Sequence, residues 1–460
     1  MPFALPVTAT LALLLTLAPA APAAPAPVTT TTPTPTATTA ANPTTASVIF
    51  IHPDGASAAT WDAIRTFNVG PDGTLHWDRL PHIALYRGAM SDCLTATSNG
   101  GATTHATGIK VASDAFGRTA AGDAGKPILT ADGKPASVAS QALAAGLPVG
   151  LVQSGIAAEP GTACFLAPSP ARNDYDGISA TLLDSGAHVL LSGGERHFLP
   201  AGVKGVHGPG ARKDGRDLIA EARAKGYVVV RTRAEIAALP PSATRVLGLF
   251  ATSSTFNDKP EAELAAANLP LYNPDAPTLA EMTDLALTVL QRSGPRFLLV
   301  IEEEGTDNFG NTNNAAGVFQ AGKRADDAIA VARAHLANHP ATLILTTADS
   351  DAGGLRLSGI PLIPGKPVPA TLPQRDDNGA PIDGVAGARS APFLAAPDAT
   401  GRRFPFFVTW ASQHDVTGGI LVRAEGAHAD RVKGSMDNTD IAKLIRFALL
   451  GPDAPPAIQP

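Results

Sequence analysis

The chain has 460 residues, 44% of them hydrophobic and 17% charged, and its formal net charge is −6 at pH 7. Such a length can bury a large core, and the composition is ordinary for a globular protein. The negative net charge gives no support to nucleic-acid binding, so no nucleic-acid partner is expected.

Residues 1–24 predict a signal peptide. Residues 11–17 form a short apolar core, and small residues from Ala18 to Ala24 offer cleavage sites, although no Lys or Arg stands near the start. Residues 25–45 are mainly Pro, Thr and Ala, which predicts a disordered linker. No later apolar run is long enough to cross a bilayer. We therefore expect an exported protein, periplasmic or secreted, whose folded domain covers residues 46–453.

The folded part alternates apolar strand patterns with helical patterns, as doubly wound α/β proteins do. The predicted strands cover residues 48–51, 149–152, 189–191, 228–230, 297–301, 342–347 and 406–409. The predicted helices include residues 136–145, 214–225, 279–292 and 315–337. Residues 355–403 are rich in Pro, Gly and Asp with weak periodicity, which indicates a surface insertion over the functional site. We predict a three-layer α/β/α sandwich around a large, mostly parallel sheet.

The two cysteines of the chain are Cys93 and Cys164. In an exported protein they could form one disulfide, but two buried thiols are equally compatible with so wide a separation in sequence. The sequence leaves this choice open.

Acidic side chains follow three of the predicted strands at the points where the strands end. Strand 48–51 runs into Asp54, and strand 342–347 runs into Asp349. Strand 297–301 runs into the largest group, which comprises Glu302, Glu303, Glu304, Asp307 and Asn311. Ligands of open α/β sheets bind just beyond the carboxyl ends of the strands. One such acid could be a turn residue, and the largest group a solvated loop, but three such ends together predict a cation site.

Residues 95–110 supply a candidate nucleophile. Ser98 can cap a helix that ends near Gly108, which would place its hydroxyl beside free backbone N–H groups and the positive end of the helix dipole. Such a helix start is a ready anion site. The alternative is an ordinary N-cap serine.

The order of these motifs resembles the alkaline phosphatase family across residues 46–450. Residues 48–55 are similar to its first strand with a metal-binding Asp, and residues 107–110 match the end of its nucleophile helix. This resemblance places the nucleophile on Ser98. The family usually has Asp before that serine, where this chain has Thr97, which stays a rival because related phosphatases and phosphodiesterases use threonine. Further similar segments are residues 185–200, 212–227, 279–283, 313–317 and 437–441.

The resemblance implies three metal positions. The first falls on Asp307, Asn311 and Asp415. The second falls on Asp54, Asp349 and Ser350. The third shares the same first-strand Asp and adds Glu302 and Glu159.

The three zinc-binding histidines of the family pattern are missing. Oxygen ligands suit Mg²⁺, with Ca²⁺ or Mn²⁺ as alternatives, better than the family-typical Zn²⁺. His414, beside Asp415, could restore one nitrogen ligand if the alignment shifts by one residue. The other histidines, including His52, His105 and His188, are expected to be structural or surface groups.

The resemblance implies an exported, metal-dependent phosphomonoesterase that forms a phosphoserine on Ser98 and acts on small phosphate esters. Arg172 aligns with the family's phosphate-clamping arginine, and a surface arginine is the alternative reading of that residue. The family is often dimeric, so a homodimer is compatible. A related phosphodiesterase or phosphotransferase, and a non-catalytic phosphate- or metal-binding protein that keeps the fold, remain as alternative functions.

Overall fold

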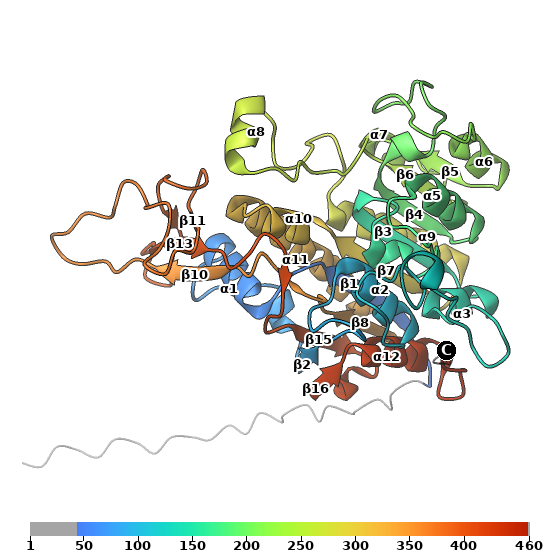
Figure 1. Ribbon diagram of the computed structural model, residues 1–460. Helices are drawn as coiled ribbons and strands as arrows, with labels where there is room; N and C mark the ends of the chain where they lie inside the picture. Colours follow the sequence, from blue (N-terminus) through green and yellow to red (C-terminus); the bar gives the residue numbers. More distant parts are fainter. Residues whose placement is uncertain (1–43, 459–460) are drawn as a thin grey trace, which may run out of the picture. The chain divides into compact units, whose positions relative to one another are not determined.

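The computed structural model describes residues 44–458. The predicted signal peptide, and the predicted linker up to residue 43, lie outside these residues. A ten-stranded sheet runs through the described chain (Figure 1). Its strands, from one edge to the other, are β16 (Gly434–Asp437), β2 (His82–Arg87), β15 (Leu421–Gly426), β8 (Thr342–Thr346), β1 (Ser47–Pro53), β7 (Leu298–Glu303), β3 (Val149–Ile156), β4 (Val189–Gly193), β6 (Val246–Leu249) and β5 (Val228–Val230). Strand β15 runs antiparallel to its neighbours β2 and β8, and the other pairs are parallel.

The central strands are apolar without alternation because both of their faces are covered. The four residues from Val48 to Ile51 have 0% exposed surface, as expected for a parallel strand between two helical layers. Ile51 pairs with Ile301 on one side and with Thr346 on the other. The three strands therefore end at the same level, and the residues after them emerge side by side.

The helices form two packed groups. Helix α11 (Ala315–Asn338) contacts both α1 (Ala58–Asn68) and α9 (Leu279–Ser293), while α2 (Ser98–Thr107) contacts α4 (Pro160–Ala163) and α12 (Thr439–Leu450). Helices α11 and α12 both reach β1. Helices α3 (Val138–Ala144) and α6 (Leu218–Ala224) lie within the predicted ranges 136–145 and 214–225. The predicted three-layer α/β/α fold is confirmed.

The insertion has a small sheet of its own. Strands β10 (Arg356–Gly359), β11 (Ile382–Asp383) and β12 (Phe393–Leu394) pair antiparallel with β13 (Pro405–Thr409). The predicted strand 406–409 therefore forms, but outside the main sheet. The ring of Phe393 stacks on Phe406 at 5.4 Å and meets Phe319 of α11 edge-on at 5.1 Å. Aromatic packing thus anchors the insertion to the helical layer.

Cys93 is exposed and Cys164 is buried, and both are free thiols. The disulfide alternative is therefore not found, and only one of the two thiols is buried. Among residues 44–458, no helix combines the length and the apolar character that crossing a membrane requires.

A pair of carboxyl groups joins the insertion to α8 (Glu261–Ala267). The carboxyl group of Glu261 interacts electrostatically with that of Asp383, and Asp383 accepts the backbone N–H of Ala315 at 2.8 Å. Burial, assisted by the nearby Asp383, raises the pKa of Glu261 to about 8. Burial also raises the pKa of Asp383 to about 6. The folded protein therefore holds protons between about pH 4 and pH 8 that the unfolded chain releases.

We expect this pair to make the free energy of unfolding fall as pH rises through that window, because the folded state binds more protons than the unfolded state. In Glu261→Gln, the decrease in the free energy of unfolding across that pH window should be smaller by at least about 1 kcal/mol. Urea midpoints at pH 5, 7 and 9 measure the effect. Glu263→Gln, on the exposed side of the same helix, is the control and should keep the wild-type pH dependence. The same slope in wild type and in Glu261→Gln would contradict the assignment.

Candidate active site

Carboxylates from β1 and β7 meet at the carboxyl edge of the sheet. Asp54, Glu302 and Glu304 have 0% exposed surface, and one carboxylate oxygen of each lies within 4.8 Å of the others. Glu302 Oε2 accepts a hydrogen bond from Gln153. Its Oε1, both oxygens of Asp54 and both of Glu304 have no hydrogen-bond partner among the described residues. This β1–β7 group (Asp54, Glu302, Glu304) fits a divalent cation, whose charge would offset the repulsion of the buried acids.

A second group shares Asp54 and adds His52 and Asp349. His52 Nε2 lies 3.6 Å from Asp54 Oδ1 and 3.9 Å from Asp349 Oδ1. Its Nδ1 lies 3.6 Å from Glu302 Oε1. Burial lowers the pKa of His52, although the charge of Asp54 works in the opposite direction. We call these three residues the β1–β8 group (His52, Asp54, Asp349).

Helix α2 approaches the β1–β8 group closely because its first turn is built from small residues. A Cβ on Gly101 would lie 2.0 Å from Asp349 Oδ2, so no side chain fits at that position. Ser98, one turn earlier, is the first residue of α2 and is 3% exposed. The helix ends at Gly108, whose φ of 78° is the left-handed conformation that favours glycine. The predicted helix is thus confirmed, with its N-terminus beside Asp349.

The N-cap of α2 is Thr97 rather than Ser98. The Thr97 hydroxyl donates to the carbonyl of Ser113 at 2.5 Å. The Ser98 hydroxyl makes no hydrogen bond to another described residue. Of the two rival nucleophiles, Ser98 is therefore the one whose hydroxyl is available.

The residues predicted for the first metal position meet at α10 (Gly305–Asn311) and β14 (Asp415–Val416). Asn311 Nδ2 lies 3.1 Å from both carboxylate oxygens of Asp307 and 3.1 Å from Asp415 Oδ1. Asn311 Oδ1 accepts the N–H of Gly353 at 3.1 Å. Asn311 therefore turns its nitrogen, not its oxygen, toward the acids, because Gly353 occupies the oxygen. The amide nitrogen thus links the two acids, and a metal-binding role for Asn311 stays a prediction. Ser350, predicted for the second position, is 2% exposed, and its Oγ has no hydrogen-bond partner among the described residues.

The acids of the site are held in unfavourable surroundings for negative charge. Burial is the largest cause that raises the pKa values of Glu302, Glu304, Asp307 and Asp349 well above their usual range, and the charge of Asp54 adds to it in each case. Without a cation these carboxyl groups favour protons. A divalent ion would compete with those protons, so metal affinity should rise with pH.

Glu159 and Arg172 lie at the margin of the β1–β7 group. Glu159 is the N-cap residue of α4, and Arg172 Nη2 lies 3.4 Å from Glu159 Oε2. A Cβ on Gly155 would lie 2.8 Å from Glu159 Cγ and 3.2 Å from Glu304 Cγ, so the two glutamates are close neighbours. The acid that completes the β1–β7 group is Glu304, whereas Glu159 reaches toward Arg172. The Arg172 side chain is 42% exposed, which leaves its guanidinium accessible to a ligand.

Glu304 belongs to the acidic group for which a cation was predicted, but no metal position was assigned to it, and His52 was expected to be a structural or surface group. Each lies two residues from a predicted ligand, Glu302 or Asp54, at the end of a strand. The expectation that His52 is a structural or surface group does not account for its position between three carboxylates. His414, the alternative nitrogen ligand beside Asp415, is exposed.

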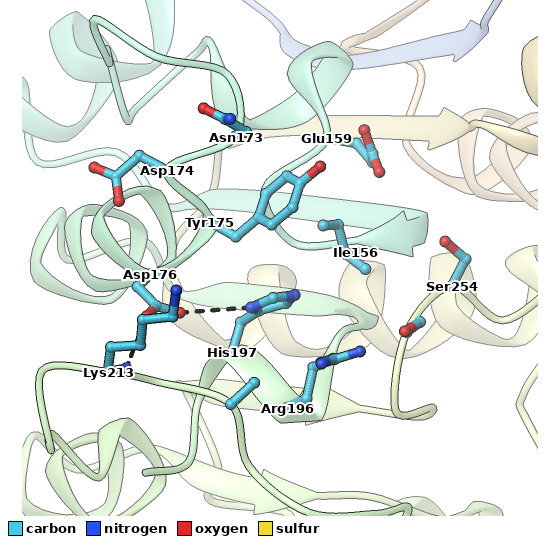
Figure 2. A pocket seen from close by; sticks show the side chains of 12 residues that line it. Ile156, Glu159, Asn173, Asp174, Tyr175, Asp176, Arg196, His197, Lys213 and Ser254 are labelled. Atoms are coloured by element: carbon cyan, nitrogen blue, oxygen red, sulfur yellow. Dashed lines mark hydrogen bonds and ion pairs between the residues drawn. The ribbon is translucent and has the colours of Figure 1, made fainter. Parts of the chain in front are cut away.

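A cavity of about 670 Å³ opens beside Glu159 (Figure 2). The rings of Tyr175 and His197 pack against each other in its lining with centroids 5.1 Å apart, and His197 Nδ1 lies 3.5 Å from Asp176 Oδ1. The remaining lining includes Arg196, Lys213 and Ser254. Its volume and its mixed aromatic and charged lining are those of a small-molecule site.

Several known proteins are similar to this chain in sequence. Residues 45–382 match the family described as Alkaline phosphatase. Streptomycin-6-phosphate phosphatase from Streptomyces griseus is 28% identical over 437 residues, which cover 88% of this chain and 90% of that protein. Repressible alkaline phosphatase from Saccharomyces cerevisiae is 28% identical, over 69% of this chain and 56% of that protein.

Solved structures share the fold. Alkaline phosphatase from Thermus thermophilus superposes with a TM-score of 0.68 at 21% identity, over 90% of this chain and 93% of that one. Alkaline phosphatase from the Antarctic bacterium TAB5 gives a TM-score of 0.64 at 20% identity, over 87% of this chain and 97% of that one. The family match and the names of the two sequence relatives support a phosphatase enzyme. The chain belongs to the alkaline phosphatase family, whose match covers most of its length.

Proposed function

We propose that this protein is an exported, metal-dependent phosphomonoesterase that hydrolyses small phosphate esters through a phosphoserine on Ser98. The observation that carries the proposal is the close approach of α2 to Asp349 at Gly101. Ser98, in the same first turn of α2, is 3% exposed, and Asp349 belongs to a group of buried acids whose carboxylate oxygens have no hydrogen-bond partner among the described residues. Family membership supports the same reaction class.

The β1–β7 and β1–β8 groups would each hold a divalent ion. Their buried, unpartnered carboxylate oxygens are donors that Mg²⁺ prefers, with Ca²⁺ and Mn²⁺ as alternatives. When bound, such ions neutralise charge on a phosphate and favour the ionised form of a nearby hydroxyl. Asp307 and Asp415, linked by the Asn311 amide, would shape the adjoining wall of the site.

The chain's own groups perform the transfer in two steps. Ser98 Oγ forms a bond to phosphorus while the bond to the ester oxygen breaks, and the alcohol leaves with the proton that the serine gave up. Water then attacks the phosphoserine, which releases phosphate and returns a proton to Ser98. The N-terminus of α2 and the guanidinium of Arg172 would hold the non-bridging oxygens of the phosphate. The cavity beside Glu159 would receive the alcohol part of the substrate.

A comparison of a phosphate monoester with the diester of the same alcohol tests this proposal. We expect the metal-loaded protein to hydrolyse the monoester at least about 100-fold faster in kcat/KM, a difference of roughly 2.7 kcal/mol. Faster turnover of the diester would favour the phosphodiesterase alternative. Streptomycin-6-phosphate, the compound in the name of one relative, is a specific monoester to include.

Arg172 should act on substrate binding. Arg172→Ala removes a charge-assisted hydrogen bond, worth about 1.5 to 3 kcal/mol, so kcat/KM for a monoester should fall roughly 10- to 100-fold. Arg216→Ala is the control, because Arg216 pairs with Glu221 on the surface. The measurement is the pair of kcat and KM values for both variants. An unchanged kcat/KM in Arg172→Ala would mean that Arg172 is an ordinary surface arginine.

Export rests on residues 1–24. Amino-terminal sequencing of the protein from the periplasm or medium should find that a segment of about this length is missing. Protein that keeps Met1 and stays inside the cell would remove export from the proposal.

A further inference from the structure

Ser350 stands where the family resemblance requires a metal-binding imidazole, and yet an imidazole lies at the same carboxylates. It comes from His52 on β1, not from the segment after β8. His52 has 0% exposed surface, and both of its ring nitrogens lack a hydrogen-bond partner among the described residues. A buried polar group left in that state destabilises the folded protein. The ring nitrogens of His52 therefore need a bonding partner that no described residue supplies.

The distances around His52 fit a shared ion better than hydrogen bonds. His52 Nε2 lies 3.6 Å from Asp54 Oδ1 and 3.9 Å from Asp349 Oδ1. Hydrogen bonds of this kind are about 2.7 to 3.2 Å long. Two donor atoms that each stand about 2.0 to 2.2 Å from one ion lie roughly 3 to 4 Å apart. The three atoms thus have the spacing of ligands around an ion.

The other surroundings of the ring do not compete for it. Phe50 stacks on His52 with centroids 6.0 Å apart, and His105 meets it edge-on at 5.4 Å. His105 Nε2 is already hydrogen-bonded to the Tyr86 hydroxyl at 2.7 Å. These neighbours orient the ring so that Nε2 points toward Asp54 and Asp349, while Nδ1 points toward Glu302.

We propose that His52 is a nitrogen ligand of the ion held by the β1–β8 group, and that it replaces the imidazole missing at Ser350. The inference rests on the metal part of the proposed function. A nitrogen ligand in the β1–β8 group makes the two metal-binding groups chemically different. A neutral imidazole that binds the ion through Nε2 keeps its proton on Nδ1, so the β1–β7 group has only oxygen donors and suits Mg²⁺. The β1–β8 group offers nitrogen and oxygen and suits Zn²⁺ or Mn²⁺.

X-ray absorption at the zinc edge tests this assignment on the full-length protein loaded with Mg²⁺ and one equivalent of Zn²⁺. Imidazole has a recognisable outer-shell scattering pattern that carboxylates lack. We expect one imidazole per zinc in the wild type and none in His52→Gln. Zinc affinity should fall about 10- to 100-fold in the variant, while the bound Mg²⁺ stays.

His414→Asn is the matched control, because His414 is exposed and adjacent to Asp415; this variant should keep the imidazole signal. A wild-type spectrum without imidazole would overturn the inference even if His52→Gln failed to fold. So would an imidazole signal that persists in His52→Gln. An imidazole signal in a protein that releases no phosphate would keep the inference and reject the proposed function. Phosphate release by a protein without the imidazole signal would reject the inference and keep the proposed function.

Discussion

Ser98→Ala should abolish monoester hydrolysis, with kcat reduced by at least about 10³-fold, because the hydroxyl that forms the bond to phosphorus is gone. Folding should be unaffected, since the hydroxyl has no hydrogen-bond partner in the described chain to lose. Initial rates with a chromogenic monoester measure the first effect, and circular dichroism the second.

Thr97→Val is the matched variant for this prediction. Thr97 donates its hydroxyl to the Ser113 carbonyl, so its loss should cost about 1 kcal/mol of stability and leave kcat within about 3-fold of wild type. If Thr97→Val is inactive and Ser98→Ala retains activity, Thr97 is the nucleophile.

Asp54→Asn should have the largest effect on metal content, because Asp54 belongs to both the β1–β7 and the β1–β8 groups. Replacing one charged oxygen with an amide should weaken binding at both positions by at least about 100-fold, and activity should fall with it. Elemental analysis after dialysis against a fixed free-metal concentration measures the loss directly. Loss of a single ion would mean that Asp54 serves one position only.

Glu303→Gln provides the control for Asp54→Asn. Glu303 is also fully buried, but its Oε1 accepts hydrogen bonds from Tyr272 at 2.7 Å and from Ser154 at 2.8 Å. An amide oxygen can keep both contacts, so this variant should retain the metal content of the wild type. A comparable metal loss in Glu303→Gln would show that the effect of Asp54→Asn is general damage to the buried centre.

The central fold could be predicted because its strands are buried on both faces. Uninterrupted apolar runs such as 48–51 and 297–301 leave few alternatives to parallel strands, and each ends in acids. The strands of the main sheet that were not predicted are β2, β6, β15 and β16. Strand β2 alternates between exposed and buried residues, and β16 has one buried residue in four, so these two lack a distinct hydrophobic run.

The details of the site depend on contacts between distant segments. The orientation of Asn311 is set by the N–H of Gly353, which no local pattern around Asn311 reveals. His52 was expected to be a structural or surface group, although it lies two residues before Asp54 at the end of β1. The sequence thus predicted which acids gather, while the donor atoms that they present required the structure.

Phosphate release by the chelated protein, before and after metals are restored, tests the account most directly. We predict that chelation abolishes hydrolysis of a phosphate monoester and that Mg²⁺, alone or together with Zn²⁺ or Mn²⁺, restores it. No phosphate release with Mg²⁺, Ca²⁺, Mn²⁺ or Zn²⁺, singly or in pairs, would contradict the account and favour a binding protein that keeps the fold without the reaction.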